Sequence, residues 1–116
     1  MIEITIKNYL EENLNKIPVV LEYPKNPPKK FVMLQLADAG CINHIDAATF
    51  FITINAPSLY EAAELREQVK DILFNAVSLE CISSATLGSD RADIDSANHV
   101  YQYDLTFNFY YYREET

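Results

Sequence analysis

The chain has 116 residues, a length typical of one domain, and 49% of them are hydrophobic, which excludes intrinsic disorder. No apolar run approaches the roughly 18 residues that a membrane span requires. The formal net charge is −8, with 17 acidic residues against 9 basic ones, so tight binding to nucleic acid is not expected. The N-terminus is amphipathic and acidic and lacks the features of a secretory signal, which favours a cytoplasmic protein.

The hydrophobic pattern divides the chain into helices, strands and turns. In chain order it predicts a helix over 4–15, a strand over 19–23, a turn over 24–30, a strand over 31–36, a loop over 38–46, a strand over 48–56, a helix over 58–77, a strand over 79–87, a loop over 88–98 and a strand over 100–112. Pro18 ends the first helix. The strand over 31–36 is expected to be covered on both faces, because Gln35 is its only polar residue.

The basic residues cluster at one place. Lys25, Lys29 and Lys30 lie in the proline-rich turn over 24–30, between two apolar runs. Two interpretations follow: a solvated loop tip, or a docking patch for an acidic neighbour.

The middle of the chain carries the clearest local signal. Phe50, Ile52 and Ile54 alternate with more polar positions, which predicts a strand with one face in a core. Ser58 and Glu61 then match a capping box, in which the serine hydroxyl accepts from the Glu61 amide and the glutamate reaches back to the Ser58 amide. Apolar residues at helical spacing follow: Ala62, Leu65, Val69, Ile72, Leu73 and Ala76.

The last strand alternates cleanly and raises a question of length. Its odd positions, such as Phe107, are predicted to face the core, and Tyr110 and Tyr112 the other side. At about 3.3 Å per residue it would span roughly 43 Å, whereas a compact domain of this size measures about 35 Å across. We therefore expect the strand to bend, to bulge or to project. The two tyrosines are then either solvent-facing or anchors of a subunit interface.

A search for chemistry finds little. No P-loop, GxGxxG, GxSxG or HExxH motif is present. His44 with Asp46, and His99 with Asp95, are isolated pairs in polar segments, where solvated side chains are expected. Cys41 and Cys81 are expected to be reduced structural thiols.

The segment over 88–98 is rich in carboxylates. Asp90, Asp93 and Asp95 do not have the spacing of an EF-hand loop, so an ordinary acidic loop is favoured over a cation site. The sequence therefore predicts a non-enzymatic protein that holds no cofactor and no metal.

The order of these elements resembles a known family. An N-terminal helix leads to IPVVLEYP and FVMLQLADAG, then to the block ATFFITINAPSLYEAAELREQVKDIL, with its paired-alanine helix start at Glu61, Ala62 and Ala63, and then to an aromatic strand. This arrangement resembles the tail-terminator and tail-completion proteins of long-tailed bacteriophages and prophages.

The resemblance implies a single α+β domain, with a mostly antiparallel or mixed sheet of about four to five strands packed against two helices. It implies a ring of about six copies at the head-proximal end of the tail, which ends tail-tube growth and docks the tail to the head. The protein would assemble in the host cytoplasm and reside in the virion. Its partners would be itself, the tail-tube protein and neck or head-completion proteins, and DNA would pass through without tight binding.

In that arrangement the subunit interface would draw on Tyr110, Tyr112, Lys25, Lys29 and Lys30, and the acidic segment would face the lumen or a neighbour through Asp90, Asp93 and Asp95. Three alternatives remain open. They are another phage neck or head-completion role, a small α+β ligand-binding or regulatory module with an apolar pocket, and a chain that is enzymatic only with a partner.

Overall fold

The chain folds into a five-stranded mixed sheet with two helices on one face, an α+β arrangement as expected. The computed structural model describes residues 1–42 and 45–112. Its elements are α1 (Ile2–Asn13), β1 (Val19–Val20), β2 (Phe31–Ile42), β3 (Ile45–Ala56), α2 (Leu59–Phe74), the 3-10 turn η1 (Asn75–Ser78), β4 (Ile82–Asp95), the 3-10 turn η2 (Ser96–Asn98) and β5 (Val100–Tyr111). The strand order is β1-β2-β3-β5-β4, and only the β1–β2 pair is parallel.

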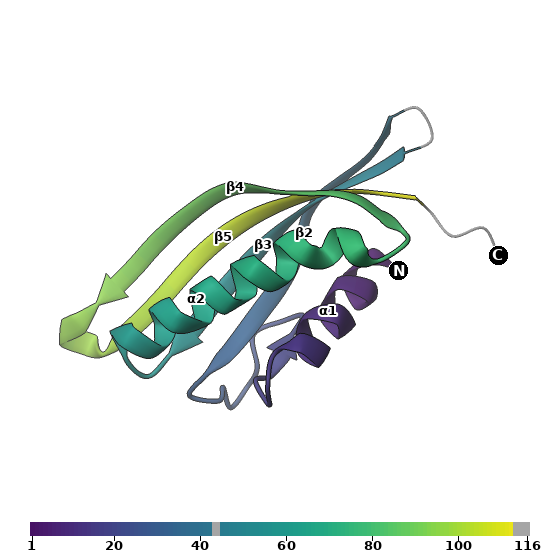
Figure 1. Ribbon diagram of the computed structural model, residues 1–116. Coiled ribbons are helices and arrows are strands. Elements are labelled where there is room, and N and C mark those ends of the chain that lie inside the picture. Colours follow the sequence, from purple (N-terminus) through teal and green to yellow (C-terminus); the bar gives the residue numbers. More distant parts are fainter. Residues whose placement is uncertain (43–44, 113–116) are drawn as a thin grey trace.

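The core lies between the helices and one face of the sheet (Figure 1). The alternation predicted for β3 and β5 is confirmed, because every second side chain of the two strands is buried under α1 and α2. These side chains are Phe50, Ile52 and Ile54 in β3 and Leu105, Phe107 and Phe109 in β5. Phe50 and Phe107 are direct cross-strand partners, so the two strands present their apolar rows to the same side.

The start of α2 has the predicted cap with one difference. The Glu61 amide donates to the Ser58 hydroxyl oxygen at 3.2 Å, which satisfies one of the free amides of the first turn. The Glu61 carboxylate, however, accepts from the Ser58 hydroxyl at 3.0 Å and not from the Ser58 amide. The helix ends at Phe74, earlier than predicted, and η1 continues the chain to Ser78.

Two segments predicted as loops are strands. β2 continues through Asp38 to Ile42 and pairs with β3 along that whole length, so the loop predicted over 38–46 is wrong. β4 runs to Asp95 in partnership with β5, so the loop predicted over 88–98 is also wrong. β2 is not covered on both faces either, because Gln35 and Leu36 are exposed. Of the strand predicted over 19–23, only Val19–Val20 pairs.

β5 does not project from the domain, so of the three alternatives expected for the last strand (bending, bulging and projecting) projection is wrong. It lies between β3 and β4, and Tyr111 near its end is opposite both Asp46 and Ile82. The domain is elongated, with extents of 48 × 24 × 24 Å, so a strand of this length fits along the long axis. The expected mismatch between strand length and domain size came from treating the domain as a sphere.

Register shifts in the two outer ladders change which side chains face the helices. They occur between Leu36 and Asp38 in β2, between Ile82 and Ser84 in β4, and between Leu87 and Ser89 in β4. A β-bulge inserts one residue into one strand and so reverses the alternation beyond it. At Gly88 a Cβ atom would lie 3.1 Å from the Asn108 side-chain nitrogen and 3.3 Å from the Thr106 carbonyl oxygen, which favours glycine at this bulge.

Candidate functional site: the uncovered face and edges of the sheet

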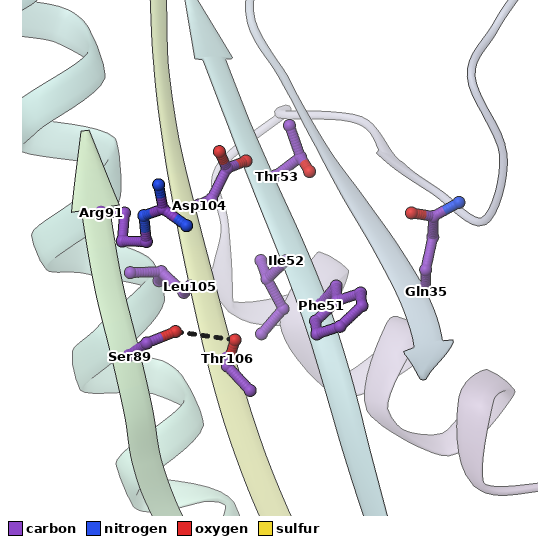
Figure 2. A pocket seen from close by; sticks show the side chains of 9 residues that line it. All are labelled: Gln35, Phe51, Ile52, Thr53, Ser89, Arg91, Asp104, Leu105 and Thr106. Atoms are coloured by element: carbon purple, nitrogen blue, oxygen red, sulfur yellow. Dashed lines mark hydrogen bonds between the residues drawn. The ribbon is translucent and has the colours of Figure 1, made fainter. Parts of the chain in front are cut away.

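The face of the sheet opposite the helices carries mainly polar side chains. Around Phe51, which is 52% exposed, lie hydroxyl, amide and charged groups from the strands β2, β3, β4 and β5 (Figure 2). They border a shallow hollow of about 270 Å³, and the lining residues are Gln35, Phe51, Ile52, Thr53, Ser89, Arg91, Asp104, Leu105 and Thr106. We call this surface the open face.

Neighbouring polar side chains of the open face bond to one another. The Thr49 hydroxyl donates to the Asn108 amide oxygen at 2.7 Å, and the Ser89 hydroxyl donates to the Thr106 hydroxyl at 2.8 Å. The Gln102 amide donates to an Asp104 carboxylate oxygen at 3.0 Å. These cross-strand and same-strand bonds fit a surface that stays compatible with water.

The side chains that could bind a metal ion are considered next. In the part of the chain that the structure describes, no group of three or more His, Cys, Asp or Glu side chains has the arrangement of a metal site. His44 lies outside the described residues. His99 is exposed and follows η2 with a left-handed backbone, φ 55°.

Asp90 is the best-connected charge of the predicted acidic segment. It points to the helix side of β4, where its carboxylate accepts from the Arg66 Nε at 2.7 Å and from the Lys70 Nζ at 3.1 Å, with a further short contact to the second guanidinium nitrogen. Arg66 also lies over the Tyr103 ring, 5.2 Å from its centre. The cluster joins α2 to β4, and the facing of Asp90 toward a lumen or a neighbour stays a prediction.

The charges of the cluster alter one another's titration. The hydrogen bond from Arg66 is the main cause that lowers the pKa of Asp90 below its ordinary value. Partial burial opposes this shift, and the hydrogen bond from Lys70 adds to it. The same hydrogen bond raises the pKa of Arg66 above its ordinary value, so both groups are charged at neutral pH.

The two remaining acidic residues lie apart from Asp90. Asp93 is exposed on β4, opposite Gln102, on the open face. Asp95 ends β4 and caps η2: it accepts from the Asn98 side chain at 2.7 Å and from the Asn98 amide at 3.3 Å. The side-chain bond from Asn98 lowers the pKa of Asp95. The three carboxylates therefore lie in three different environments and do not form one acidic loop.

The predicted interface residues are accessible. Tyr110 and Tyr112 are 42% and 53% exposed, which confirms the predicted register of the last strand. They do not lie on a projecting edge strand, because β5 is between β3 and β4, and their place in an interface stays a prediction. Lys25 and Lys29 are exposed and Lys30 is half-buried, in the segment between β1 and β2.

The sheet ends in two long strands with backbone groups facing outward. Within the described residues β2 has a second neighbour only at Val32 and Met33, where β1 pairs with it, and β4 pairs with β5 alone. The sequence revealed only part of these edges: strands were predicted over 31–36 and 79–87, and the rest of β2 and β4 was predicted as loop. Cys41 on β2 is exposed, and Cys81, just before β4, is half-buried; both are free thiols.

Neither described helix is long and apolar enough to cross a membrane. No protein-family model matches the chain, and no curated protein matches it either.

Proposed function

We propose that the protein is a non-enzymatic virion subunit that forms a ring at the head-proximal end of a long phage tail. In this role it ends growth of the tail tube and docks the tail to the head. The observation that carries the proposal is the open face: one side of the sheet is left without helices and carries mainly polar side chains around the exposed Phe51. The resemblance described from the sequence supplies the kind of assembly.

The chemistry of the open face suits the wall of a channel for DNA. Its hydroxyl and amide groups hydrogen-bond among themselves and with water, and its charged groups include Arg91 together with Asp93 and Asp104. A basic wall would hold the phosphate backbone, whereas an acidic or neutral wall lets it pass. The chain's net charge of −8 gives the whole ring a repulsive field.

The ligand-binding alternative makes a different demand on the same surface. A small-molecule site is normally concave and mostly apolar, with a few convergent polar groups. The hollow around Phe51 is open to one side; six of its nine lining residues are polar, although its exposed surface is more apolar than polar. The ring stays the proposal, and a metabolite bound in this hollow would favour the alternative.

Electron microscopy of the concentrated, negatively stained protein tests the proposal. We expect rings with a central opening, and light scattering should give the mass of several chains. In a gel-shift assay at low salt, the wild-type ring should not bind double-stranded DNA tightly. A protein that stays monomeric at high concentration, or that carries a metabolite in the hollow through purification, would contradict the proposal.

A matched pair of variants examines the channel wall. Thr53→Lys with Thr106→Lys raises the net charge by two on the open face, and Glu64→Lys alone raises it by the same two at an exposed position of α2. If the open face lines the channel, the first variant should bind DNA threaded through rings in a salt-sensitive manner. Equal DNA binding by both variants would show that the open face has no special position in the ring.

A further inference from the structure

We propose that copies of this chain join edge to edge, with the β4 strand of one copy pairing antiparallel with the β2 strand of the next. The sheet would thereby continue from subunit to subunit. This inference rests on the proposed function in one respect, namely that the chain associates with itself, and it names the surface involved. The argument uses strand direction, register, side-chain type and charge.

The two edges have the geometry that such a ladder requires. β2, β3, β5 and β4 are successively antiparallel, so β2 and β4 run in opposite directions. When two copies lie side by side in the same orientation, β4 of the first is therefore antiparallel to β2 of the second. Outward amides and carbonyls of an edge strand are a template for this pairing. β1 leaves the edge of β2 open over 34–42.

The open stretches also lie at the same height in the sheet. Leu36 is opposite Phe50, Phe50 is opposite Phe107, and Phe107 is opposite Leu87. Following the register in the same way places residues 34–41 of β2 level with residues 82–90 of β4. A neighbour can thus be added by a simple sideways step, without a slip along the strands.

Side chains brought together by this step match in polarity. Leu36, 38% exposed, and the half-buried Leu87 both lie on the helix side of the sheet, at opposite edges of the same row. Pairing would bury these two leucines against each other and continue the core into the next copy. On the open face the same step brings Gln35 opposite Ser89, which pairs polar with polar. A slip by one residue would set leucine against serine.

A hollow beside the β2 edge offers room for a side chain of the neighbour. It measures about 290 Å³ and is lined by Met1, Glu3, Leu21, Leu34, Gln35 and Leu36. On the β4 side, Phe74 is 41% exposed, and its ring lies 5.2 Å from that of Phe107. Phe107 shares the row of Leu36, so the sideways step brings Phe74 toward this hollow. Burial of an exposed aromatic ring is a common anchor of interfaces.

Charges at the ends of the two edges are opposite. Phe31 shares its row with Asn55, Gln102 and Asp93. Lys29 and Lys30 immediately precede Phe31 at one side of the sheet, while Asp93 lies at the other side. β1 lies outside β2 at the neighbouring residues Val32 and Met33, so adjacent copies bring these positive and negative groups toward each other across β1, and their attraction favours the head-to-tail orientation over its reverse.

Bulges restrict the edges to a partner of suitable curvature. Natural sheets use bulges and edge charges to prevent indiscriminate strand pairing. The register shifts near Leu36 and Leu87 bend both edges close to the proposed contact. A flat foreign strand fits such edges poorly, whereas a copy of the same curved sheet can follow them.

Cysteine cross-linking tests the pairing directly. In a Cys41→Ser/Cys81→Ser background, we would introduce Leu36→Cys with Leu87→Cys and oxidise the protein at concentrations where it associates. Within one chain these two positions are separated by β3 and β5, about 14 Å at ~4.8 Å per strand, which is too far for a disulfide. We expect a ladder of covalent multimers on a non-reducing gel that collapses to one band on reduction.

The matched control moves one cysteine along the same edge. Ala92 is opposite Tyr103, whereas Leu87 is opposite Phe107, so Ala92→Cys lies about 13 Å along β5 from the predicted contact. Leu36→Cys with Ala92→Cys should give less than a tenth of the cross-linked product. Leu36→Cys alone should give none, and cross-linked dimers from it would indicate a symmetric β2–β2 contact and overturn the proposal.

The outcomes separate this inference from the proposed function. A wild-type ring whose Leu36→Cys/Leu87→Cys variant does not cross-link overturns the edge pairing and leaves the ring intact. Cross-linked open chains without rings support the edge pairing and contradict the ring. A wild-type protein that is monomeric by light scattering at all concentrations overturns both.

Discussion

Asp90 connects β4 to α2 through two basic side chains, and its position depends on the bulge at Gly88. Without the extra residue, Ser89 would face the helix and Asp90 would lie on the open face. A glycine within a strand is a signal for a bulge, but the segment around Gly88 was predicted as a loop, so the ion-pair cluster was not predicted. The aspartate appeared instead as part of an acidic loop.

Removing the charge of Asp90 should lower stability. Asp90→Asn keeps the side-chain shape but leaves Arg66 and Lys70 with only the exposed Glu67 carboxylate as an ion-pair partner. The Asp90 side chain is only 17% exposed, so we expect a loss of about 1–2 kcal/mol in the free energy of unfolding from urea melts at pH 7. The control, Asp93→Asn, changes an exposed carboxylate of the same strand and should cost less than about 0.5 kcal/mol.

The same pair of variants gives a pH-dependent signature. The pKa of Asp90 is lowered in the folded protein from its ordinary value of 3.8, so the unfolded chain takes up this proton first. The stabilisation is therefore complete above about pH 4 and is lost as the pH falls through the lower folded value. Urea melts of wild type and Asp90→Asn should converge on acidification. A difference that stays constant down to pH 2 would contradict the ionic role of Asp90.

The cap and the buried face of α2 can be tested separately. Ser58→Ala removes the oxygen that accepts from the Glu61 amide and should cost about 1 kcal/mol. Val69→Ala should cost more, because Val69 is fully buried against the sheet and its loss leaves a cavity. Glu64→Ala, on the exposed side, is the control for helix propensity. Urea melts in which Glu64→Ala is the most damaging of the three would show that the helix faces are misplaced.

The register of β5 has its own test. Phe107→Ala should cost about 3–5 kcal/mol, because the ring is fully buried between β5 and α2. Tyr110→Ala, on the open face of the same strand, should keep the fold and cost far less. Circular dichroism with urea melts measures both. The opposite order would mean that the strand is shifted by one residue.

Elements with local signals were predicted well, and elements defined by pairing were not. The block from Phe50 through α2 has an alternating strand, a cap and a helical apolar stripe, all readable over short distances. The outer part of β2 and most of β4 lack an apolar alternation, because both of their faces are largely exposed there. Backbone bonds to β3 and β5 hold them, and those bonds depend on a partner distant in sequence.

A charge swap examines the orientation of copies in the assembly. Lys29→Glu should weaken self-association, because in the proposed head-to-tail arrangement it adds a negative charge at the end of the sheet that faces the end carrying Asp93 of the neighbour. Adding Asp93→Lys should restore it, while Asp93→Lys alone should weaken it. Analytical ultracentrifugation at low and high salt measures each variant, and salt should reduce the differences. Additive losses in the double variant would contradict the proposed facing of these groups.

The bulges in β2 and β4 have a consequence for the number of subunits in the proposed ring. A head-to-tail contact has no intrinsic end: each added copy presents the same free edge as the first. What closes the circle is the turn made at every junction, about 60° if six copies meet. In the proposed ring the bulges would lie beside that junction and bend its two strands, and they would thereby set the angle between neighbouring copies. Deleting Ala37 or Gly88 would then change the number of subunits in the ring, or turn the ring into an open spiral, while each junction stays as strong as before.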